Sequence, residues 1–249
     1  MKTKAAWFAA VWLLPLPLVA QTPAVPTMDH EPHHHLALHN DFVKVFNVEV
    51  PLGDSIILHS HDQGTVAVAI GEQLVTVGIP GKPDVHQKNA DAQVRLQRSG
   101  YVHSTHVDGD TPYHTVAVEL MRPQTNFHNV CAEILPGQPL NCVDVPARIS
   151  SAYTSQALLE SRETFVQLVR VLPHQSVKLA DFPSSPGAPE VIVSLDAGSI
   201  SANGAKRPEK ALQPGDFVWI DGAADHDSVY QNRGEKEARF LEIIFPLVP

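Results

Sequence analysis

The sequence is short of basic residues and of cysteine, and it has no long apolar run after its first twenty residues. Its 18 Lys and Arg stand against 27 Asp and Glu, a formal net charge of -9. Such a chain repels phosphate backbones, which argues against nucleic-acid binding. No segment after residue 20 is apolar enough to span a bilayer, so we expect no stable membrane anchor. With 43% hydrophobic residues, the composition is that of an ordinary folded protein.

The first twenty residues differ from the rest. Lys2 and Lys4 precede an apolar run over 5–20 that Pro15 and Pro17 interrupt. About 16 apolar residues with two prolines fall short of the roughly 20 that a membrane helix needs. The pattern predicts a signal peptide over residues 1–20 and export to the periplasm or the extracellular space. No cysteine lies near the cleavage region, so a lipid anchor has no attachment point.

Cys131 and Cys142 are the only cysteines. An exported chain with an even number of cysteines usually oxidises them, and we predict a structural disulfide. Closing a loop of about 12 residues would stabilise the fold by roughly 3 kcal/mol on the chain-entropy model. A thiol nucleophile or half of a metal site would be the alternatives, but the sequence has no Cys-x-x-Cys pattern.

Short alternating runs separated by Gly and Pro turns predict an all-β barrel or sandwich. Residues 21–35 form a Pro- and His-rich stretch without alternation, which predicts an extended arm. Only residues 154–162 suggest a helix, because their Ser, Gln, Leu and Glu content lacks strand alternation. The runs that predict strands in the first half are 42–50, 55–59, 65–70, 73–79, 92–97, 101–107 and 113–120.

The chain repeats itself at an offset of 123 residues. Self-similarity of this kind indicates two copies of one β unit. We place them at 36–124 and 163–249, joined by a connector over 125–162 that holds both cysteines and the expected short helix. The matched pairs are Phe42-Val43 with Phe165-Val166, Val118-Glu119-Leu120 with Leu241-Glu242-Ile243, and His103 with His226.

The 14 histidines include a His-x-His pair, His59 and His61, that follows Gly53 after five residues. Residues two apart on a strand face the same way, so both imidazoles can aim at one point. His103, in Gly100-Tyr101-Val102-His103, can supply a third nitrogen. Here the sequence resembles the cupin superfamily, whose motifs are Gly-x5-His-x-His-x3/4-Glu-x6-Gly and Pro-x-Gly-x2-His-x3-Asn. The two units then imply a bicupin of two tandem jelly-roll barrels.

The departures from the cupin motifs define the expected site. The glutamate of the first motif would fall at Thr65 or Val66, while Arg98 and Val107 replace the Pro and Asn of the second. Asp62 has the wrong strand parity to replace the glutamate, and Gln63 is a weak ligand. What remains is a three-histidine site for a divalent ion, with His59, His61 and His103 as ligands. Imidazole suits Fe, Ni, Cu and Zn, with Mn also possible, and three neutral ligands favour an anionic substrate.

The second unit lacks this set. The counterparts of His59 and His61 are Phe182 and Ser184, which leaves His226 alone. We expect His226 to pack structurally, in a barrel interior filled by Phe182, Phe217 and Trp219.

Other residues are weaker candidates. His114 shares strand parity with Val116 and Val118, a face that we expect to point into the first barrel, so it is either a general base near the metal or a satisfied core histidine. Arg95 and Arg98 can clamp a carboxylate or be solvated charges, and Tyr101 can place its hydroxyl near the metal or simply pack. A further tract, which resembles a metal-capturing sequence but fits an exposed strand edge better, comprises His33, His34, His35 and His39.

Three functional classes fit these residues. The first is a metal-dependent, dioxygenase-like oxidoreductase acting on a small anionic molecule. The second is a cupin that binds a metal or small ligand without turnover. The third is a structural assembly protein whose sheet edges mediate a homodimer. The absence of a convincing acid or base in the sequence favours metal-centred chemistry over hydrolysis.

Overall fold

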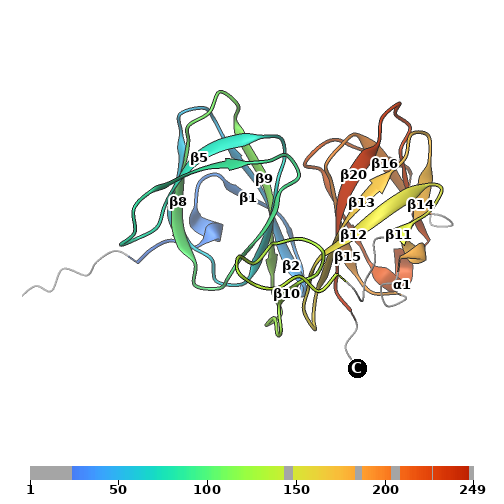
Figure 1. Ribbon diagram of the computed structural model, residues 1–249, viewed down its shortest axis with the longest axis horizontal. Coiled ribbons are helices and arrows are strands. Elements are labelled where there is room, and N and C mark those ends of the chain that lie inside the picture. The colour runs from blue at the N-terminus through green and yellow to red at the C-terminus, as the bar shows by residue number, and fades with distance from the viewer. Residues whose placement is uncertain (1–23, 143–147, 183–186, 203–207, 226, 247–249) are drawn as a thin grey trace, which may run out of the picture.

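The computed structural model describes residues 24–142, 148–182, 187–202, 208–225 and 227–246. Its described part consists of two β barrels that lie side by side (Figure 1). The strands of the first half are β1 (His34–His39), β2 (Val43–Val50), β3 (Ser55–Ser60), β4 (Thr65–Ala69), β5 (Gln73–Gly78), β6 (Val85–Asn89), β7 (Val94–Gln97), β8 (Val102–Val107) and β9 (Tyr113–Leu120). Those that follow are β10 (His128–Asn129), β11 (Arg148–Ile149), β12 (Tyr153–Glu160), β13 (Phe165–Val171), β14 (Ser176–Lys178), β15 (Glu190–Ser194), β16 (Gly198–Ala202), β17 (Lys210–Leu212), β18 (Phe217–Ile220), β19 (Ser228–Gln231) and β20 (Ala238–Ile244). Helical turns are short: η1 (Met28–His30), η2 (Leu179–Asp181) and α1 (Gly222–Asp225).

The two barrels have the same topology. The first is built from a sheet in the order β1-β2-β9-β4-β7 and a sheet in the order β3-β8-β5-β6. The second repeats this as β12-β13-β20-β15-β18 and β14-β19-β16-β17, with β10 and β11 added at β12. Residues that are 123 apart in the sequence occupy equivalent positions in the two barrels. Val45 lies opposite Val118 in the first barrel, and Leu168 lies opposite Leu241 in the second. The predicted all-β fold of two tandem jelly-roll barrels is confirmed.

The predicted helix over 154–162 is wrong. Residues 154–160 fall on β12, which pairs with β13 except for a bulge between Ala157 and Leu159 and belongs to the second barrel's larger sheet. Gln, Leu, Ala and Glu favour helix as isolated residues. Pairing with β13 and burial of Ala157, Leu158 and Leu159 override that preference, because tertiary packing decides strand formation.

A large apolar core lies between the barrels. Val43 and Val45 of β2 and Val118 of β9 share it with Leu241 and Ile243 of β20. Phe217 and Trp219 also pack here, against Phe42 and Phe245. The sequence predicted that they fill the interior of the second barrel, and this prediction is wrong. The odd-numbered residues of β18 face the first barrel instead.

The interior of the second barrel is filled by other aromatic side chains. Phe182 packs there against Tyr153 and Phe240, as its predicted structural role requires. Tyr230 is fully buried beside Phe240. A Cβ atom at Gly198 would lie only 2.3 Å from the Tyr230 hydroxyl, so glycine is needed at that position. Ser184 and His226, the other positions predicted for this barrel, lie outside the described residues.

The described part of the N-terminal arm docks on the first barrel. Met28, in η1, is buried in the barrel core with Phe46 and Ile56, and the Ser60 amide donates to the Pro26 carbonyl. The predicted signal peptide, residues 1–20, lies outside the described residues. Among those described, no helix has the length and apolar character needed to cross a membrane.

The predicted disulfide between Cys131 and Cys142 is present, with Cα atoms 4.6 Å apart. The buried Asn129 organises the loop that this disulfide closes. Its side-chain oxygen accepts from the amides of Ile134 and Leu135, and its nitrogen donates to the carbonyls of Leu135 and Gln138. The loop is thus fixed at both its ends and its middle.

The shared core predicts that the two barrels unfold together. Phe245 is buried in that core, so Phe245→Ala should lower the free energy of unfolding by about 3–5 kcal/mol. Urea denaturation followed by both tryptophan fluorescence and circular dichroism should show one coincident transition. The partly exposed Leu172 gives a matched control, since Leu172→Ala should change stability by less than about 1 kcal/mol. Two separate transitions in the wild-type protein would contradict the shared core.

Candidate metal centre

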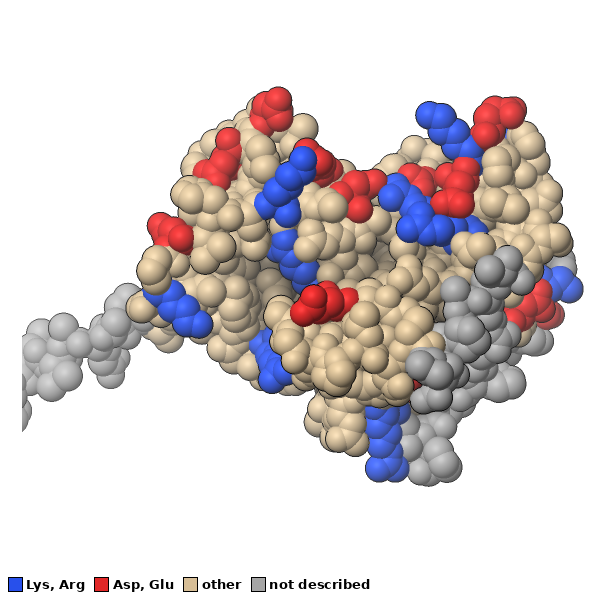
Figure 2. Space-filling model, viewed as in Figure 1, with Lys and Arg blue, Asp and Glu red and all other residues tan. Residues whose placement is uncertain are grey.

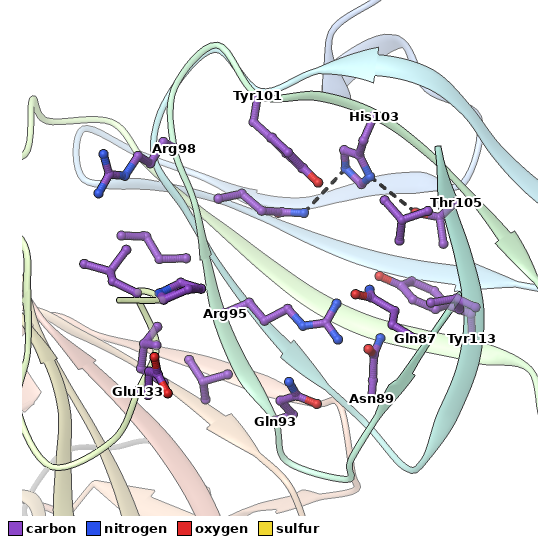
Figure 3. Close-up of a pocket in the computed structure, with 18 residues that line it drawn as sticks. Gln87, Asn89, Gln93, Arg95, Arg98, Tyr101, His103, Thr105, Tyr113 and Glu133 are labelled. Carbon is purple, nitrogen blue, oxygen red and sulfur yellow. Dashed lines mark hydrogen bonds between the residues drawn. The ribbon is translucent and has the colours of Figure 1, made fainter. Parts of the chain in front are cut away.

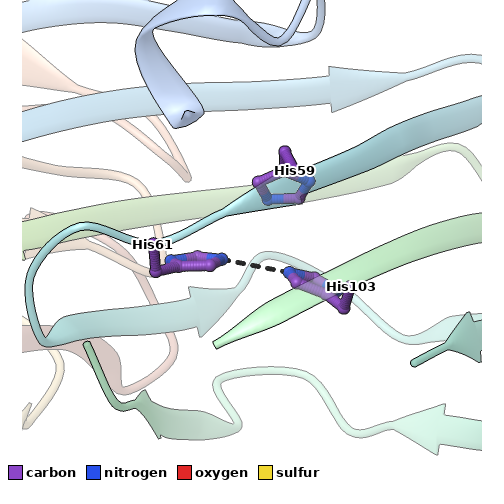
Figure 4. Close-up of side chains that lie close together, drawn as sticks. All are labelled: His59, His61 and His103. Carbon is purple, nitrogen blue, oxygen red and sulfur yellow. Dashed lines mark hydrogen bonds between the residues drawn. The ribbon is translucent and has the colours of Figure 1, made fainter. Parts of the chain in front are cut away.

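The structure brings His59, His61 and His103 together. His59 lies on β3, His61 follows that strand directly, and His103 lies on β8 opposite His59. One ring nitrogen from each lies within 4.8 Å of the others, and all three side chains are buried (Figure 4). Among the described residues, no other group of three or more potential ligands comes together in this way.

Backbone hydrogen bonds place His61 beyond the end of β3. Its amide donates to the Tyr101 carbonyl over 2.9 Å, and its carbonyl accepts from the Gly100 amide over 2.8 Å. Gly100 has a φ of 77°, in the left-handed region that glycine adopts without strain. The turn before β8 thereby fixes His61 against the strand that carries His103.

Each of the three imidazoles has a partner at Nδ1. His59 Nδ1 donates to the Ile57 carbonyl over 2.9 Å. His61 Nδ1 lies 3.1 Å from the Thr65 hydroxyl, and His103 Nδ1 lies 3.3 Å from the Thr105 hydroxyl. When Nδ1 carries the proton, Nε2 keeps its lone pair free, and this is the arrangement found around metal-bound histidines.

One of the three Nε2 atoms has no hydrogen-bond partner among the described residues, and the other two lie against each other. His59 Nε2 is buried without any hydrogen bond, and His61 Nε2 lies 3.0 Å from His103 Nε2. Two lone pairs at that distance repel unless a cation lies between them. Metal–nitrogen bonds of about 2.0–2.1 Å place neighbouring ligand atoms about 3.0–3.4 Å apart. The three residues therefore fit a divalent ion.

The electrostatics of the cluster keep its histidines neutral. Burial, with the neighbouring imidazoles, lowers the pKa of His61 to about 2 and that of His103 to about 3. Burial also lowers the pKa of His59. Metal ligation requires neutral imidazole, so the metal-free cluster is already in the ligating form.

Thr65 occupies one of the two positions expected for the cupin glutamate. Its hydroxyl contacts His61 Nδ1 and lies 3.4 Å from the Gln63 carbonyl. It therefore orients a ligand instead of being one. Asp62 does not join the cluster, in agreement with the three-histidine interpretation.

Two polar side chains border His103. The Tyr101 ring stacks on it with centroids 4.8 Å apart, and burial raises the pKa of that phenol. The Gln97 amide nitrogen lies 3.4 Å from His103 Nε2. Tyr101 is thus close to the cluster, as expected. Gln97 was missed by the sequence analysis, although it shares strand parity with Arg95.

A cavity of about 610 Å³ adjoins the cluster at His103 (Figure 3). Its wall from the first barrel is rich in amides and phenols, and Arg95 projects into it. Burial lowers the pKa of the Arg95 guanidinium, with Tyr113 and Tyr101 as its nearest electrostatic partners. Arg98 also lines the cavity, but it is exposed and lies apart from Arg95. Further polar lining residues are Gln87, Asn89, Gln93, Gln97 and Glu133.

His114 does not point into the first barrel, contrary to prediction. Its Nε2 lies 2.8 Å from the Asn47 side-chain oxygen. A Cβ atom at Gly215 of the second barrel would lie 2.3 Å from its ring. The parity argument chose the wrong face because both faces of β9 are buried. Tyr113, of the opposite parity, is the residue that lines the cavity.

The histidine tract near the N-terminus divides in two. His35 and His39 are exposed on β1, which is the edge of its sheet. His34 turns inward and its ring centroid lies 4.8 Å from that of His59. The exposed-edge interpretation therefore holds for the former pair and misses His34.

No protein-family model matches the sequence, and neither does any curated protein sequence. Solved structures do match the fold. AerE from Microcystis aeruginosa superposes with a TM-score of 0.54 at 9% identity, over 86% of this chain and 98% of that chain. A formate complex of Lactobacillus farciminis oxalate decarboxylase gives 0.54 at 12% identity, over 92% and 88%. A variant of salicylate 1,2-dioxygenase from Pseudoaminobacter salicylatoxidans gives 0.54 at 11%, over 82% and 72%.

These likenesses show the fold. The chain has the cupin fold in its two-barrel form, with a three-histidine cluster in the first barrel.

The cluster predicts that each of the three histidines is needed for metal binding. His59→Ala, His61→Ala and His103→Ala should each reduce bound divalent metal from about one ion per chain to almost none, because two imidazoles bind an ion weakly. Elemental analysis after dialysis measures this. His86→Ala, which removes a largely exposed imidazole, should keep full occupancy. Full retention in all three cluster variants would exclude the site.

The depressed pKa values predict how acid affects the metal-free protein. Unfolded histidine titrates near pH 6.5, whereas buried His61 and His103 titrate near 2 and 3. Below about pH 6.5 the unfolded chain therefore binds protons that the folded chain does not. The free energy of unfolding should fall as the pH drops toward 3, by up to about 1.4 kcal/mol per pH unit for each histidine. In urea melts with a chelator, His61→Gln should lose less stability than wild type over this range. Equal slopes would contradict the assignment.

Proposed function

We propose that this protein is a metal-dependent bicupin that binds a small organic anion in its first barrel and acts on it by oxidative chemistry. The observation that carries the proposal is the convergence of one ring nitrogen from each of three histidines beside a cavity that contains a partly buried arginine. His59, His61 and His103 would hold the ion, whose identity stays open among Fe, Mn, Ni, Cu and Zn.

Arg95 supports an anionic ligand. Its side chain lies in the cavity (Figure 3), and no ion pair involving it occurs among the described residues. A half-buried guanidinium without a carboxylate partner gains most from a ligand that supplies one, because its fork of donors matches carboxylate geometry. The amides of Gln87, Asn89 and Gln93 offer further donors and acceptors for the rest of the molecule.

The cavity favours metal-centred chemistry over hydrolysis. Glu133 is the only carboxylate among its described lining residues, and it is exposed on the disulfide loop. A bound divalent ion supplies a Lewis acid and, for a redox-active metal, an electron acceptor. The protein residues would orient the substrate at Arg95, place the Tyr101 hydroxyl beside His103, and shield the site within the barrel. The structures with this fold include an oxalate decarboxylase and a salicylate dioxygenase.

We further propose that the protein is exported. The signal-like residues 1–20 support this, and a formed disulfide is typical of an oxidising compartment. Elemental analysis of protein from its native compartment, purified without a metal-affinity tag, should find one metal per chain. A metal-free protein would point to the structural alternative, and a metal without any turnover would point to the binding alternative.

Arg95 predicts the ligand dependence. In the metal-loaded protein, Arg95→Gln should weaken binding of oxalate, formate and salicylate by about thirtyfold, because loss of a charged hydrogen bond costs about 2 kcal/mol. Isothermal titration calorimetry measures this directly. Arg162→Gln removes an equal charge from an exposed position that does not line this cavity and should leave affinity unchanged. Equal losses in both variants would show that net charge, and not the cavity, attracts the anion.

A further inference from the structure

The position of His59 depends on a bulge in β3. On β8, His103 and Thr105 are two positions apart, whereas their partners on β3, His59 and Ile56, are three positions apart. One residue is therefore extra on β3, as in a β-bulge. Ile56 and His59 are 2% and 0% exposed, while Ile57 and Leu58 between them are 48% and 38% exposed. In an unbroken strand Ile56 and His59 would face opposite sides of the sheet, because side chains alternate.

A buried carboxylate from the N-terminal arm holds this bulge. Glu31 Oε1 accepts a hydrogen bond from the Ile57 amide over 3.1 Å. The Ile57 carbonyl in turn accepts from His59 Nδ1 over 2.9 Å. Ile57 therefore links the Glu31 carboxylate on one side to a ligand of the candidate metal centre on the other.

The second oxygen of Glu31 holds a neighbouring imidazole. Oε2 accepts from the His33 amide over 2.8 Å and lies 2.7 Å from His34 Nδ1. The His34 ring packs against that of His59, and the side chains of Glu31 and His34 are 0% and 5% exposed. Glu31 thus supports His59 in two ways, through the backbone of the bulge and through ring contact.

Glu31 is ionised in this setting. Burial alone would raise its pKa, but hydrogen bonds from His34 and from the backbone amides lower it. A divalent ion on three neutral imidazoles carries uncompensated positive charge, and burying that charge costs free energy. A fixed carboxylate behind one ligand reduces this electrostatic cost.

We propose that Glu31 is a positioning residue of the metal centre and that the arm from Pro26 to His34 is an integral part of that centre. This inference rests on the proposed metal binding. Glu31 does not coordinate the ion. It fixes the bulge that turns His59 inward and supplies a negative charge behind it.

The experiment compares Glu31→Gln with Asp29→Asn. Asp29 lies on the same arm and pairs with Lys44 over 2.6 Å, so its variant weakens arm docking without touching β3. Co²⁺ is titrated into the metal-free proteins and followed by its visible absorption bands, which report ligand geometry. Thermal melts by circular dichroism verify that each variant is folded.

Glu31→Gln should weaken Co²⁺ binding by about 10- to 100-fold, the loss typical of removing an outer partner of a ligating histidine, and should change the absorption spectrum. Hydrogen exchange at the Ile57 amide should also accelerate in the metal-free variant. Asp29→Asn should resemble wild type in all three measurements. Unaltered affinity and spectrum in a folded Glu31→Gln protein would overturn the positioning role.

The titration separates this inference from the proposed function. If wild type binds Co²⁺ and His59→Ala does not, the metal centre stands, and the Glu31→Gln result decides the positioning role alone. If wild type fails to bind Co²⁺, Zn²⁺ and Mn²⁺, the proposed function falls, and the positioning role falls with it. If Asp29→Asn loses as much affinity as Glu31→Gln, arm docking in general and not the Glu31 carboxylate is responsible, which also overturns the inference.

Discussion

Burial of both faces of one sheet is the constraint on which the rest of the structure depends. In the sheet containing β2 and β9, Val45 and Val118 pack against the second barrel, whereas Phe46 and Ala117 pack inside the first. The opposite sheet, with β3 and β8, is buried only on its inner side, and His106 and Thr76 lie together on its open outer face. The histidine cluster is built on this second sheet. Thr65 of β4 and Gln97 of β7 contact the cluster from the first sheet. Acidic and basic side chains lie intermixed over the molecular face seen in Figure 2.

The sequence predicts the fold and the three histidines well because both depend on spacing. The sequence shows all of these features directly: the two-residue alternation, the repeat, and the His-x-His pair with a distant third histidine. The errors arise where pairing or packing decides. Residues 154–160 are helix formers held in a strand by β13. His114 and Trp219 lie on strands with two buried faces, for which alternation cannot say which face is the interior. The contact between Glu31 and β3 could not be predicted from the sequence, because its partner, Ile57, belongs to a bulge that no sequence pattern indicates.

The two barrels differ in the charged groups at one buried polar position. In the first, the Glu119 carboxylate lies 3.8 Å from the Lys44 ammonium. In the second, the equivalent residues are Glu242 and Gln167, and Glu190 takes part as well. Full burial and the neighbouring Glu190 raise the pKa of Glu242 well above its ordinary value, which favours the neutral form of this carboxyl. The second barrel has thereby removed charge from its interior, in keeping with an aromatic core that leaves little space for a ligand.

The disulfide loop has a consequence for how this protein can change during evolution. Ile134, Leu135 and Pro136 line the cavity of the first barrel, although they lie in the segment that leads into the second. Asn129 and the Cys131–Cys142 bond fix the loop backbone, and Leu135 is buried in the core between the barrels. The exposed positions Glu133 and Pro136 therefore tolerate exchange better than Leu135. The histidines lie on other strands and are insulated from such exchanges. Substitution at these loop positions would therefore reshape the wall of the cavity while leaving the three histidines in place.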